Sequence, residues 1–268
     1  MTSHRLRRRL ERCHSERRAA LIPFFTAGFP AKSSTLEALL AADEAGCDMI
    51  EIGVPFSDPL ADGPAIQRTS QAALANGVDL PWILDVVSSF RRHSDVPVAL
   101  MGYYNPFLQY GPVAFTRDAQ NAGVDALIVP DLPPDEAGWL HAAARAHRLS
   151  MIYLIAPTST PARMRYVSRL CTDLSYCVSV TGVTGARTQL SGDVQNYLRK
   201  VRRVVSKPIV VGFGLSTPKH VRDLAPYADG LVVGSALVPV LEHGGRGRKL
   251  RQSVRAALKP LVRAAAGV

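Results

Sequence analysis

The feature that most constrains the fold is an alternation of short apolar segments with longer stretches of helical periodicity. Eight segments are predicted as strands: Leu21–Thr26, Met49–Gly53, Val96–Met101, Ala126–Val129, Met151–Ile155, Tyr176–Val180, Ile209–Gly212 and Gly230–Val233. Strands that are apolar along their length are typical of a parallel sheet covered by helices. Helices are expected at Ser34–Ala45, Pro81–Arg92, Pro134–His147, Pro161–Leu170, Val194–Val204, Pro218–Leu224 and Leu250–Ala265.

Eight strand–helix units in 268 residues favour an α/β fold of the (β/α)8 type, a TIM barrel. An open doubly wound sheet is the alternative, but no G-x-G-x-x-G motif follows the first strand to support it. Because no low-complexity linker divides the body, we expect one domain over residues 1–268. No apolar run reaches the roughly 18 residues of a membrane helix, so no membrane contact is expected.

The net charge of +10 is concentrated at the two ends of the chain. Residues 1–18 carry seven arginines and two glutamates, and residues 245–268 carry seven basic residues and no acidic one. The central body is close to neutral, which argues against a basic groove and a nucleic-acid partner. We interpret both ends as solvated basic helices, with contact to an acidic partner or RNA as the alternative. The four cysteines lack C-x-x-C spacing, which fits a protein of the reducing cytoplasm.

Active sites of TIM barrels form at the carboxyl ends of the strands, and here those ends carry acids. Glu51 interrupts the apolar second strand, and alternation points it into the barrel. A buried carboxylate costs several kcal/mol unless it is neutralised or partnered, so we interpret Glu51 as a catalytic carboxyl with a raised pKa, or else as an ion-paired residue or one exposed at an edge. The following loop adds Asp58 and Asp62, which are either ordinary turn residues or second members of an acid–base pair.

The last two strands end in glycine-rich turns, which predicts a phosphate site. Gly212 ends the seventh strand and Gly214 follows it, and after the eighth strand Gly234 precedes Ser235, which begins a short helix. Phosphate sites recur at these two positions in such barrels. Two Thr-Gly steps at 181–185 indicate either a loop that closes over a phosphorylated substrate or a flexible surface turn.

Large side chains at other strand ends form either an apolar pocket or ordinary core: Phe24, Met101, Tyr103, Ile128, Ile155 and Tyr176. His141, His147 and His220 are expected to lie in helices and face water, and they form no metal cluster with the cysteines, so no metal site is predicted. The residues alone therefore indicate a barrel enzyme that acts on a phosphorylated, partly apolar small molecule by carboxylate acid–base catalysis.

The segment Glu51–Gly63, EIGVPFSDPLADG, resembles the signature of the tryptophan synthase alpha chain family. Further segments resemble the family in order: LIPFFTAGFP at 21–30, MGYYNP at 101–106, GVDALIVPDLP at 123–133, LIAPTS at 154–159, SVTGVTG at 179–185, VGFG at 211–214 and GSALV at 234–238. The resemblance covers about residues 19–240.

The resemblance implies a lyase of tryptophan biosynthesis, which cleaves indole-3-glycerol phosphate to indole and glyceraldehyde 3-phosphate by a retro-aldol reaction. Glu51 matches the family's general acid, which also takes the hydroxyl proton, and Asp62 matches the aspartate that binds the indole N–H and stabilises positive charge. The family partner is the beta chain, which holds pyridoxal phosphate and receives indole within an αββα heterotetramer. No cofactor is expected in this chain.

Other positions are carried over in the same way. Thr184 and Gly185 match the mobile loop, and Gly214, Gly234 and Ser235 match phosphate contacts. The matching indole-pocket positions are Phe24, Met101, Ile128, Ile155, Tyr176 and Phe213, and Asp58 lies in the region that communicates with the partner.

The sequence departs from the family pattern at Phe29, where many members have aspartate, and at the longer, more basic N-terminus, which adds a contact or covers the bottom of the barrel. A stand-alone lyase that releases free indole would share the same motifs. A non-catalytic scaffold that binds phosphate or RNA through the basic ends is the alternative of another class, and the presence of both Glu51 and Asp62 argues against it.

Overall fold

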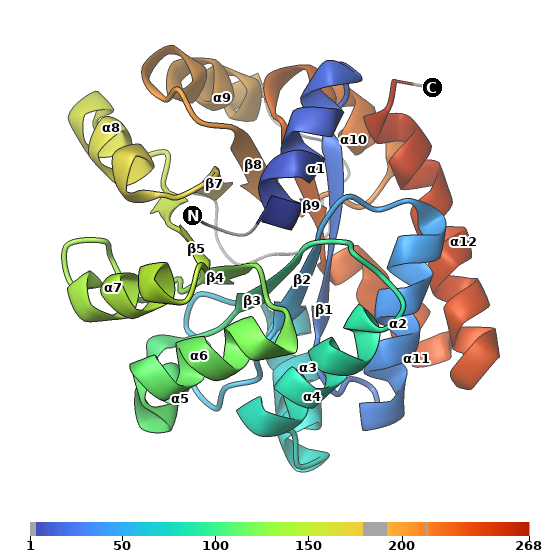
Figure 1. Cartoon of the computed structure of the whole chain (residues 1–268). Helices are drawn as coiled ribbons and strands as arrows, with labels where there is room; N and C mark the ends of the chain where they lie inside the picture. The colour runs from blue at the N-terminus through green and yellow to red at the C-terminus, as the bar shows by residue number, and fades with distance from the viewer. Residues whose placement is uncertain (1–3, 179–191, 213, 268) are drawn as a thin grey trace.

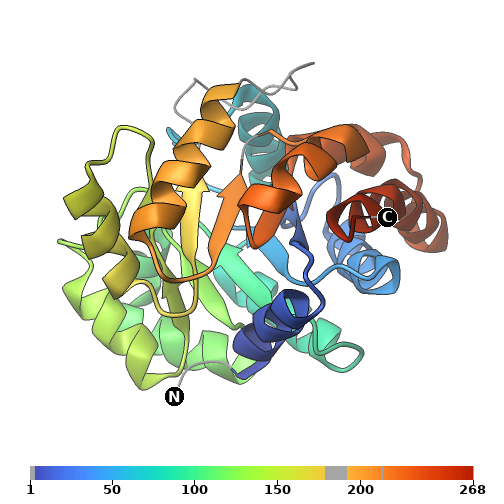
Figure 2. The same cartoon turned by 90° about the horizontal axis from the view of Figure 1, so that it is seen from above.

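The strands form a nearly closed parallel barrel surrounded by helices (Figures 1 and 2). The computed structural model describes residues 4–178, 192–212 and 214–267. Within them the strand order is β5-β4-β3-β2-β1-β9-β8-β7-β6, and every pairing is parallel. The strands are β1 Ala20–Thr26, β2 Ile50–Gly53, β3 Val98–Met101, β4 Ala126–Ile128, β5 Ser150–Ile152, β6 Leu154–Ile155, β7 Ser175–Val178, β8 Ile209–Gly212 and β9 Gly230–Val233.

The two edges of this sheet are halves of one strand. Only Tyr153 separates β5 from β6, and β5 pairs with β4 while β6 pairs with β7. Counting β5 and β6 as one strand, the sheet closes on itself as an eight-stranded barrel, which confirms the predicted (β/α)8 fold.

The helices are α1 His4–Ser15, α2 Lys32–Ala45, α3 Pro64–Ala75, α4 Leu80–Arg91, α5 Tyr104–Tyr110, α6 Pro112–Ala122, α7 Gly138–Ala146, α8 Pro161–Leu170, α9 Gly192–Val204, α10 Pro218–Leu224, α11 Val238–His243 and α12 Gly247–Ala265, with short 3₁₀ turns η1 Ala225–Tyr227 and η2 Ser235–Leu237. None of these helices is both long and apolar enough to cross a bilayer.

The sequence analysis did not predict α3, α5 and α6, and it placed the start of α7 too early. The short helix predicted from Ser235 is confirmed as η2, which runs directly into α11. The predicted helix from Pro134 begins only at Gly138, because residues 133–136 form a turn in which the Glu136 N–H donates to the Pro133 carbonyl. Regular i to i+4 bonding starts when the His141 N–H donates to the Ala137 carbonyl.

Two apolar layers hold the barrel together. The outer layer lies between strands and helices and includes Phe25, Ile52 and Leu100. The inner layer fills the barrel and includes Ile22, Ala99 and Ile128. Successive strand residues enter opposite layers, as the pleat requires, so the side chains that reach the inside are fixed by parity along each strand.

The basic N-terminal helix closes the lower end of the barrel, where the strands begin (Figures 1 and 2). Its apolar face (Leu6, Leu10 and Cys13) is buried on the inner layer. Its arginines reach buried aspartates that precede strands: Arg5 Nε lies 2.9 Å from Asp125 Oδ1.

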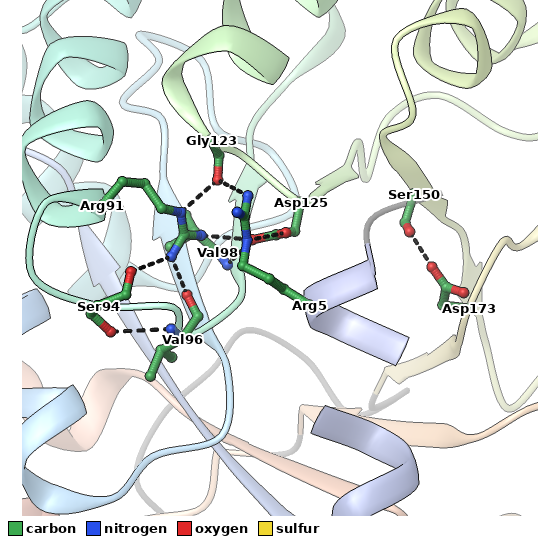
Figure 3. Close-up of polar contacts among 9 residues, drawn as sticks. All are labelled: Arg5, Arg91, Ser94, Val96, Val98, Gly123, Asp125, Ser150 and Asp173. Carbon is green, nitrogen blue, oxygen red and sulfur yellow. Dashed lines mark hydrogen bonds and ion pairs between the residues drawn. The ribbon is translucent and has the colours of Figure 1, made fainter. Parts of the chain in front are cut away.

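Figure 3 shows that Arg91 from α4 reaches the same Asp125 carboxylate as Arg5. Nearby, the hydroxyl of Ser150 donates to Asp173, whose carboxylate also pairs with Arg7. The interpretation of α1 as a solvated helix was therefore wrong, because its arginines neutralise carboxylates that the barrel buries. The expectation that the N-terminal segment covers the barrel bottom is confirmed.

Candidate active site

Glu51 is the buried carboxyl at the upper end of the barrel. It lies on β2, is 1% exposed, and faces the interior beside Phe24 of β1 and Ala99 of β3 in the strand register. Its Oε1 has no hydrogen-bond partner among the described residues. Burial raises the pKa of Glu51 from its ordinary 4.5 to about 8. At neutral pH the side chain is therefore a neutral acid that can give up a proton.

Tyr176 connects Glu51 to the opposite wall. From β7 its hydroxyl donates to Glu51 Oε2 across 3.5 Å, and this bond opposes the upward pKa shift of the carboxyl. Tyr176 fits because Gly212 on β8 has no side chain: a Cβ there would lie 2.5 Å from the Tyr176 hydroxyl oxygen. Gly212, predicted as a phosphate contact, thus also makes room for the tyrosine that faces the acid.

Asp62 belongs to the same electrostatic site. Burial raises its pKa from 3.8 to about 6, and a hydrogen bond with the Tyr103 side chain opposes the shift. The Tyr103 hydroxyl also accepts from the Ala61 N–H across 2.8 Å, which ties the loop to the start of α5. Burial raises the pKa of Tyr176 well above its usual value, and the charges of Glu51 and Asp62 raise it further. Both acids therefore lie within electrostatic range of one tyrosine.

The two acids differ in ionisation, which suits a division of roles. Between pH 6 and 8 the pKa values of about 8 and about 6 leave Glu51 neutral and Asp62 charged. Pairs of carboxyls with separated pKa values typically divide into a proton donor and a stabiliser of positive charge. The arrangement can thus protonate a bound molecule and balance the cation that forms.

The predicted pocket residues do not all face the inside. Ile128 and Tyr176 belong to the inner layer, and Phe24 and Met101 pack on it while remaining partly exposed. Ile155 is fully buried in the outer layer, and its carbonyl accepts from the Tyr197 hydroxyl at 2.7 Å.

The pleat of the split strand explains the position of Ile155. Residues 151, 153 and 155 point outward, and residues 150, 152 and 154 point the other way. The structure does not bring Ile155 to the other pocket residues, and Leu154 faces the interior in its place.

Phe24 spans the space between two glycine strand ends. A Cβ at Gly53 would lie 2.4 Å from the Phe24 ring, and one at Gly234 would lie 3.4 Å from it. Gly234 and Ser235 stand where β9 passes into η2, and Gly214 follows β8 with φ +63°. These residues occupy the strand ends predicted for phosphate. Thr184, Gly185 and Phe213 lie outside the described residues.

The loop that carries Asp62 projects from the protein. Asp58 is exposed and accepts from the hydroxyl of Ser57, and Leu60 is 92% exposed. Phe56 stacks on Tyr103 with ring centroids 5.3 Å apart. The loop therefore has an inner side at the acids and an outer side that carries an exposed leucine.

The prediction that three histidines face water was wrong for His220, which is 5% exposed with its Nδ1 3.4 Å from the Ser216 hydroxyl. His141 is half-buried against the Tyr153 hydroxyl at 2.9 Å, and His147 contacts Thr116. In the part of the chain that the structure describes, no group of three His, Cys, Asp or Glu side chains could hold a metal ion.

Sequence reasoning missed several residues of the site. Tyr176 was assigned only an apolar role, and no sequence signal marks it as the partner of Glu51, because the two are 125 residues apart. Phe56 was also missed, although it immediately precedes the acidic loop. Phe29, the departure from the family pattern, is 5% exposed and packs in the outer apolar layer.

Comparison with known proteins gives one consistent result. Residues 10–265 match the family model described as tryptophan synthase alpha chain. The tryptophan synthase alpha chain of Roseiflexus sp. (strain RS-1) is 48% identical over 238 residues, which cover 88% of this chain and 91% of that one. The alpha chain of Citrifermentans bemidjiense is 50% identical over 223 residues, covering 83% and 84%.

Solved structures agree. A structure of Mycobacterium tuberculosis tryptophan synthase superposes with a TM-score of 0.90 at 38% identity, covering 99% of both chains. A structure of the tryptophan synthase a2b2 complex from the hyperthermophile Pyrococcus furiosus gives a TM-score of 0.85 at 39% identity, and the match covers 91% of this chain and 98% of that one.

Proposed function

The chain belongs to the tryptophan synthase alpha chain family, and from this premise we propose that Glu51 and Asp62 cleave indole-3-glycerol phosphate to indole and glyceraldehyde 3-phosphate. The observation that carries the assignment is the buried Glu51, whose pKa of about 8 and unpartnered Oε1 provide an available proton donor. The reaction makes the protein a lyase.

Glu51 first donates its proton to C3 of the indole ring, which leaves the ring positively charged. The Glu51 carboxylate then takes the proton from the hydroxyl on the adjacent carbon of the glycerol phosphate tail. As that oxygen forms a carbonyl, the carbon–carbon bond to C3 breaks and its electron pair returns to the ring. Indole and the aldehyde leave, and Glu51 is protonated again, so one residue performs both proton transfers.

Asp62 stabilises the charged intermediate. With a pKa of about 6 it is an anion at neutral pH, able to accept a hydrogen bond from the indole N–H, where the positive charge develops. Tyr103 holds this carboxylate and its loop in position. The apolar interior around Phe24, Met101 and Ile128 would receive the ring, and the strand ends at Gly214, Gly234 and Ser235 would receive the phosphate.

The partner we propose is a beta chain, within an αββα assembly. The loop that carries Asp62 supports this proposal, because Asp58 and the 92% exposed Leu60 lie on its outer side. Docking on this loop would act directly on the position of Asp62. The proposed steps require only the carboxyl groups of this chain, and pyridoxal phosphate is assigned to the beta chain. We also propose a cytoplasmic location, since a reducing compartment suits the free buried thiols of Cys13, Cys47, Cys171 and Cys177.

The test is indole release from indole-3-glycerol phosphate by the wild type, Glu51→Gln, and the control Glu136→Gln at an exposed glutamate. We expect Glu51→Gln to lower the rate by about 10² to 10⁴, because it removes both proton transfers. The control should keep the wild-type rate. A Glu51→Gln protein that keeps most of its rate would remove Glu51 from the proposed role.

A stand-alone lyase is the second candidate, and adding the cognate beta chain distinguishes the two. An increase in the rate of indole release supports the assembly. An unchanged rate at saturating beta chain supports the stand-alone enzyme.

A further inference from the structure

A second cavity opens at the other end of the barrel from the proposed active site. Its volume is about 1000 Å³, and it lies between α1, the end of α12, η1 and the loops that lead into β7, β8 and β9. Asp173 and Asp229 in its wall precede β7 and β9, whereas Glu51 and Tyr176 act from the upper part of the barrel. In the views of Figures 1 and 2, α1 crosses this lower end.

The wall of this cavity carries an excess of positive charge. Five arginines line it: Arg7, Arg17, Arg18, Arg202 and Arg222. The acidic side chains in the wall are Glu11, Asp173 and Asp229, so arginines outnumber acids, and His14 adds a further nitrogen ring.

Three of the five arginines are held by carboxylates. Arg7 lies 3.1 Å from Asp173 Oδ1, and Arg202 lies 2.7 Å from Asp229 Oδ2. Arg18 lies 2.7 Å from Asp48, which is buried. These ion pairs hold the three guanidinium groups in place in the wall.

The other two arginines have no carboxylate partner among the residues that the structure describes. Arg17 follows α1 with φ +53°, in a turn where its N–H donates to the His14 carbonyl, and Arg222 projects from α10. Both are exposed and both contribute to the wall. Guanidinium groups bind phosphate and carboxylate oxygens through paired hydrogen bonds, so this pair supplies the charge that a bound anion would neutralise.

Most of the rest of the wall is apolar, with Leu10 of α1, Ala225 and Pro226 of η1, and Ala264 and Ala265 of α12, and Thr172 adds a hydroxyl group. We propose that this cavity is a second ligand site, separate from the proposed active site, which binds a small multivalent phosphate-bearing anion between Arg17 and Arg222. The anion would connect the turn that follows α1 to α10 and so hold the helix that closes the barrel.

The test is calorimetric titration of the full chain with inorganic pyrophosphate, comparing the wild type with Arg17→Gln/Arg222→Gln. We expect the double variant to weaken pyrophosphate binding at this site by at least about tenfold, because it removes charge-assisted hydrogen bonds. The matched control is Arg246→Gln/Arg248→Gln, which removes two exposed arginines at the other end of α12, about 25 Å away along a helix that rises 1.5 Å per residue.

The active site also offers a phosphate position, so its occupancy is followed separately, by the inhibition of indole release by pyrophosphate. We expect the inhibition constant to stay unchanged in Arg17→Gln/Arg222→Gln while the calorimetric affinity falls by at least about tenfold. The comparison of heats remains valid even if the chain releases no indole.

Three outcomes would overturn the inference. The first is that the wild type gives no heat beyond one active-site equivalent. The second is that the control pair weakens binding as much as the cavity pair, and the third is that the inhibition constant and the calorimetric affinity shift together. The last result would mean that both measurements report one site.

Discussion

The burial of Glu51 has a consequence for stability that can be measured apart from catalysis. The pKa of about 8 in the folded chain, against an ordinary 4.5, means that folding favours the protonated form. Stability associated with this group is complete below pH 4.5 and is lost as the pH rises toward 8. Glu51→Gln removes the titration and keeps an oxygen that can accept from Tyr176, so it should relieve this loss.

The magnitude follows from the two pKa values. Relative to a side chain that cannot ionise, Glu51 costs about 1 kcal/mol at pH 5, about 3 kcal/mol at pH 7 and about 5 kcal/mol at pH 9, since each pKa unit is worth 1.36 kcal/mol. The difference in unfolding free energy between Glu51→Gln and wild type should therefore grow by about 4 kcal/mol from pH 5 to pH 9. Titrations common to both proteins cancel in this difference.

Urea unfolding of wild type and Glu51→Gln at pH 5, 7 and 9 measures this difference in unfolding free energy. The control is Glu136→Gln, at an exposed glutamate. The control difference should be independent of pH. If the Glu51→Gln difference also stayed constant within about 1 kcal/mol, folding would not shift the pKa of Glu51, and the case for a neutral acid at pH 7 would be refuted.

Three further predictions concern the site. The kcat/KM of the wild type should rise with pH through about 6, as Asp62 ionises, and fall through about 8, as Glu51 loses its proton; a profile flat over this range would contradict both assignments. Asp62→Asn should lower kcat by about 10², less than Glu51→Gln, because it weakens charge stabilisation without removing the proton donor, and equal losses would argue against this division. Gly212→Ala should destabilise the fold by about 1–3 kcal/mol through its clash with the Tyr176 hydroxyl, and thermal unfolding should show partial recovery with Tyr176→Phe, which lacks that oxygen.

The barrel could be predicted because parallel strands buried on both faces are continuous apolar runs. The failure to predict helix α5 has a physical reason. Helix α5, Tyr104–Tyr110, contains Pro106 and reads as a turn, but that proline lies in the first turn, where its missing N–H has no intrahelical acceptor to lose. Helices α3 and α6 begin on Pro64 and Pro112, which is the same start signal that correctly marked α8 at Pro161.

Only those features of the site that depend on one strand could be predicted from the sequence. Glu51 stood out because a charged residue within an apolar run must be neutralised or paired. Its contact with Tyr176 depends on the closure of the barrel, which brings β7 opposite β2, and no local pattern encodes that. Ile155 shows the same limit. Alternation along the strand shows that Leu154 and Ile155 face opposite sides, but it does not show which of the two faces the inside of the barrel.

The two ends of the barrel place buried carboxyl groups in opposite surroundings. At the lower end Asp48, Asp125 and Asp173 are buried, and each is paired with an arginine of α1, namely Arg9, Arg5 and Arg7 in turn. At the upper end Glu51 is equally buried and, in the described structure, has only a tyrosine hydroxyl as its partner. An arginine beside Glu51 would hold it as an anion and remove its proton, just as the absence of arginines below would leave several charges buried without compensation. The arginine-rich N-terminus is therefore part of what permits this division, because it neutralises the lower carboxylates without bringing a cation to the acid that must stay neutral.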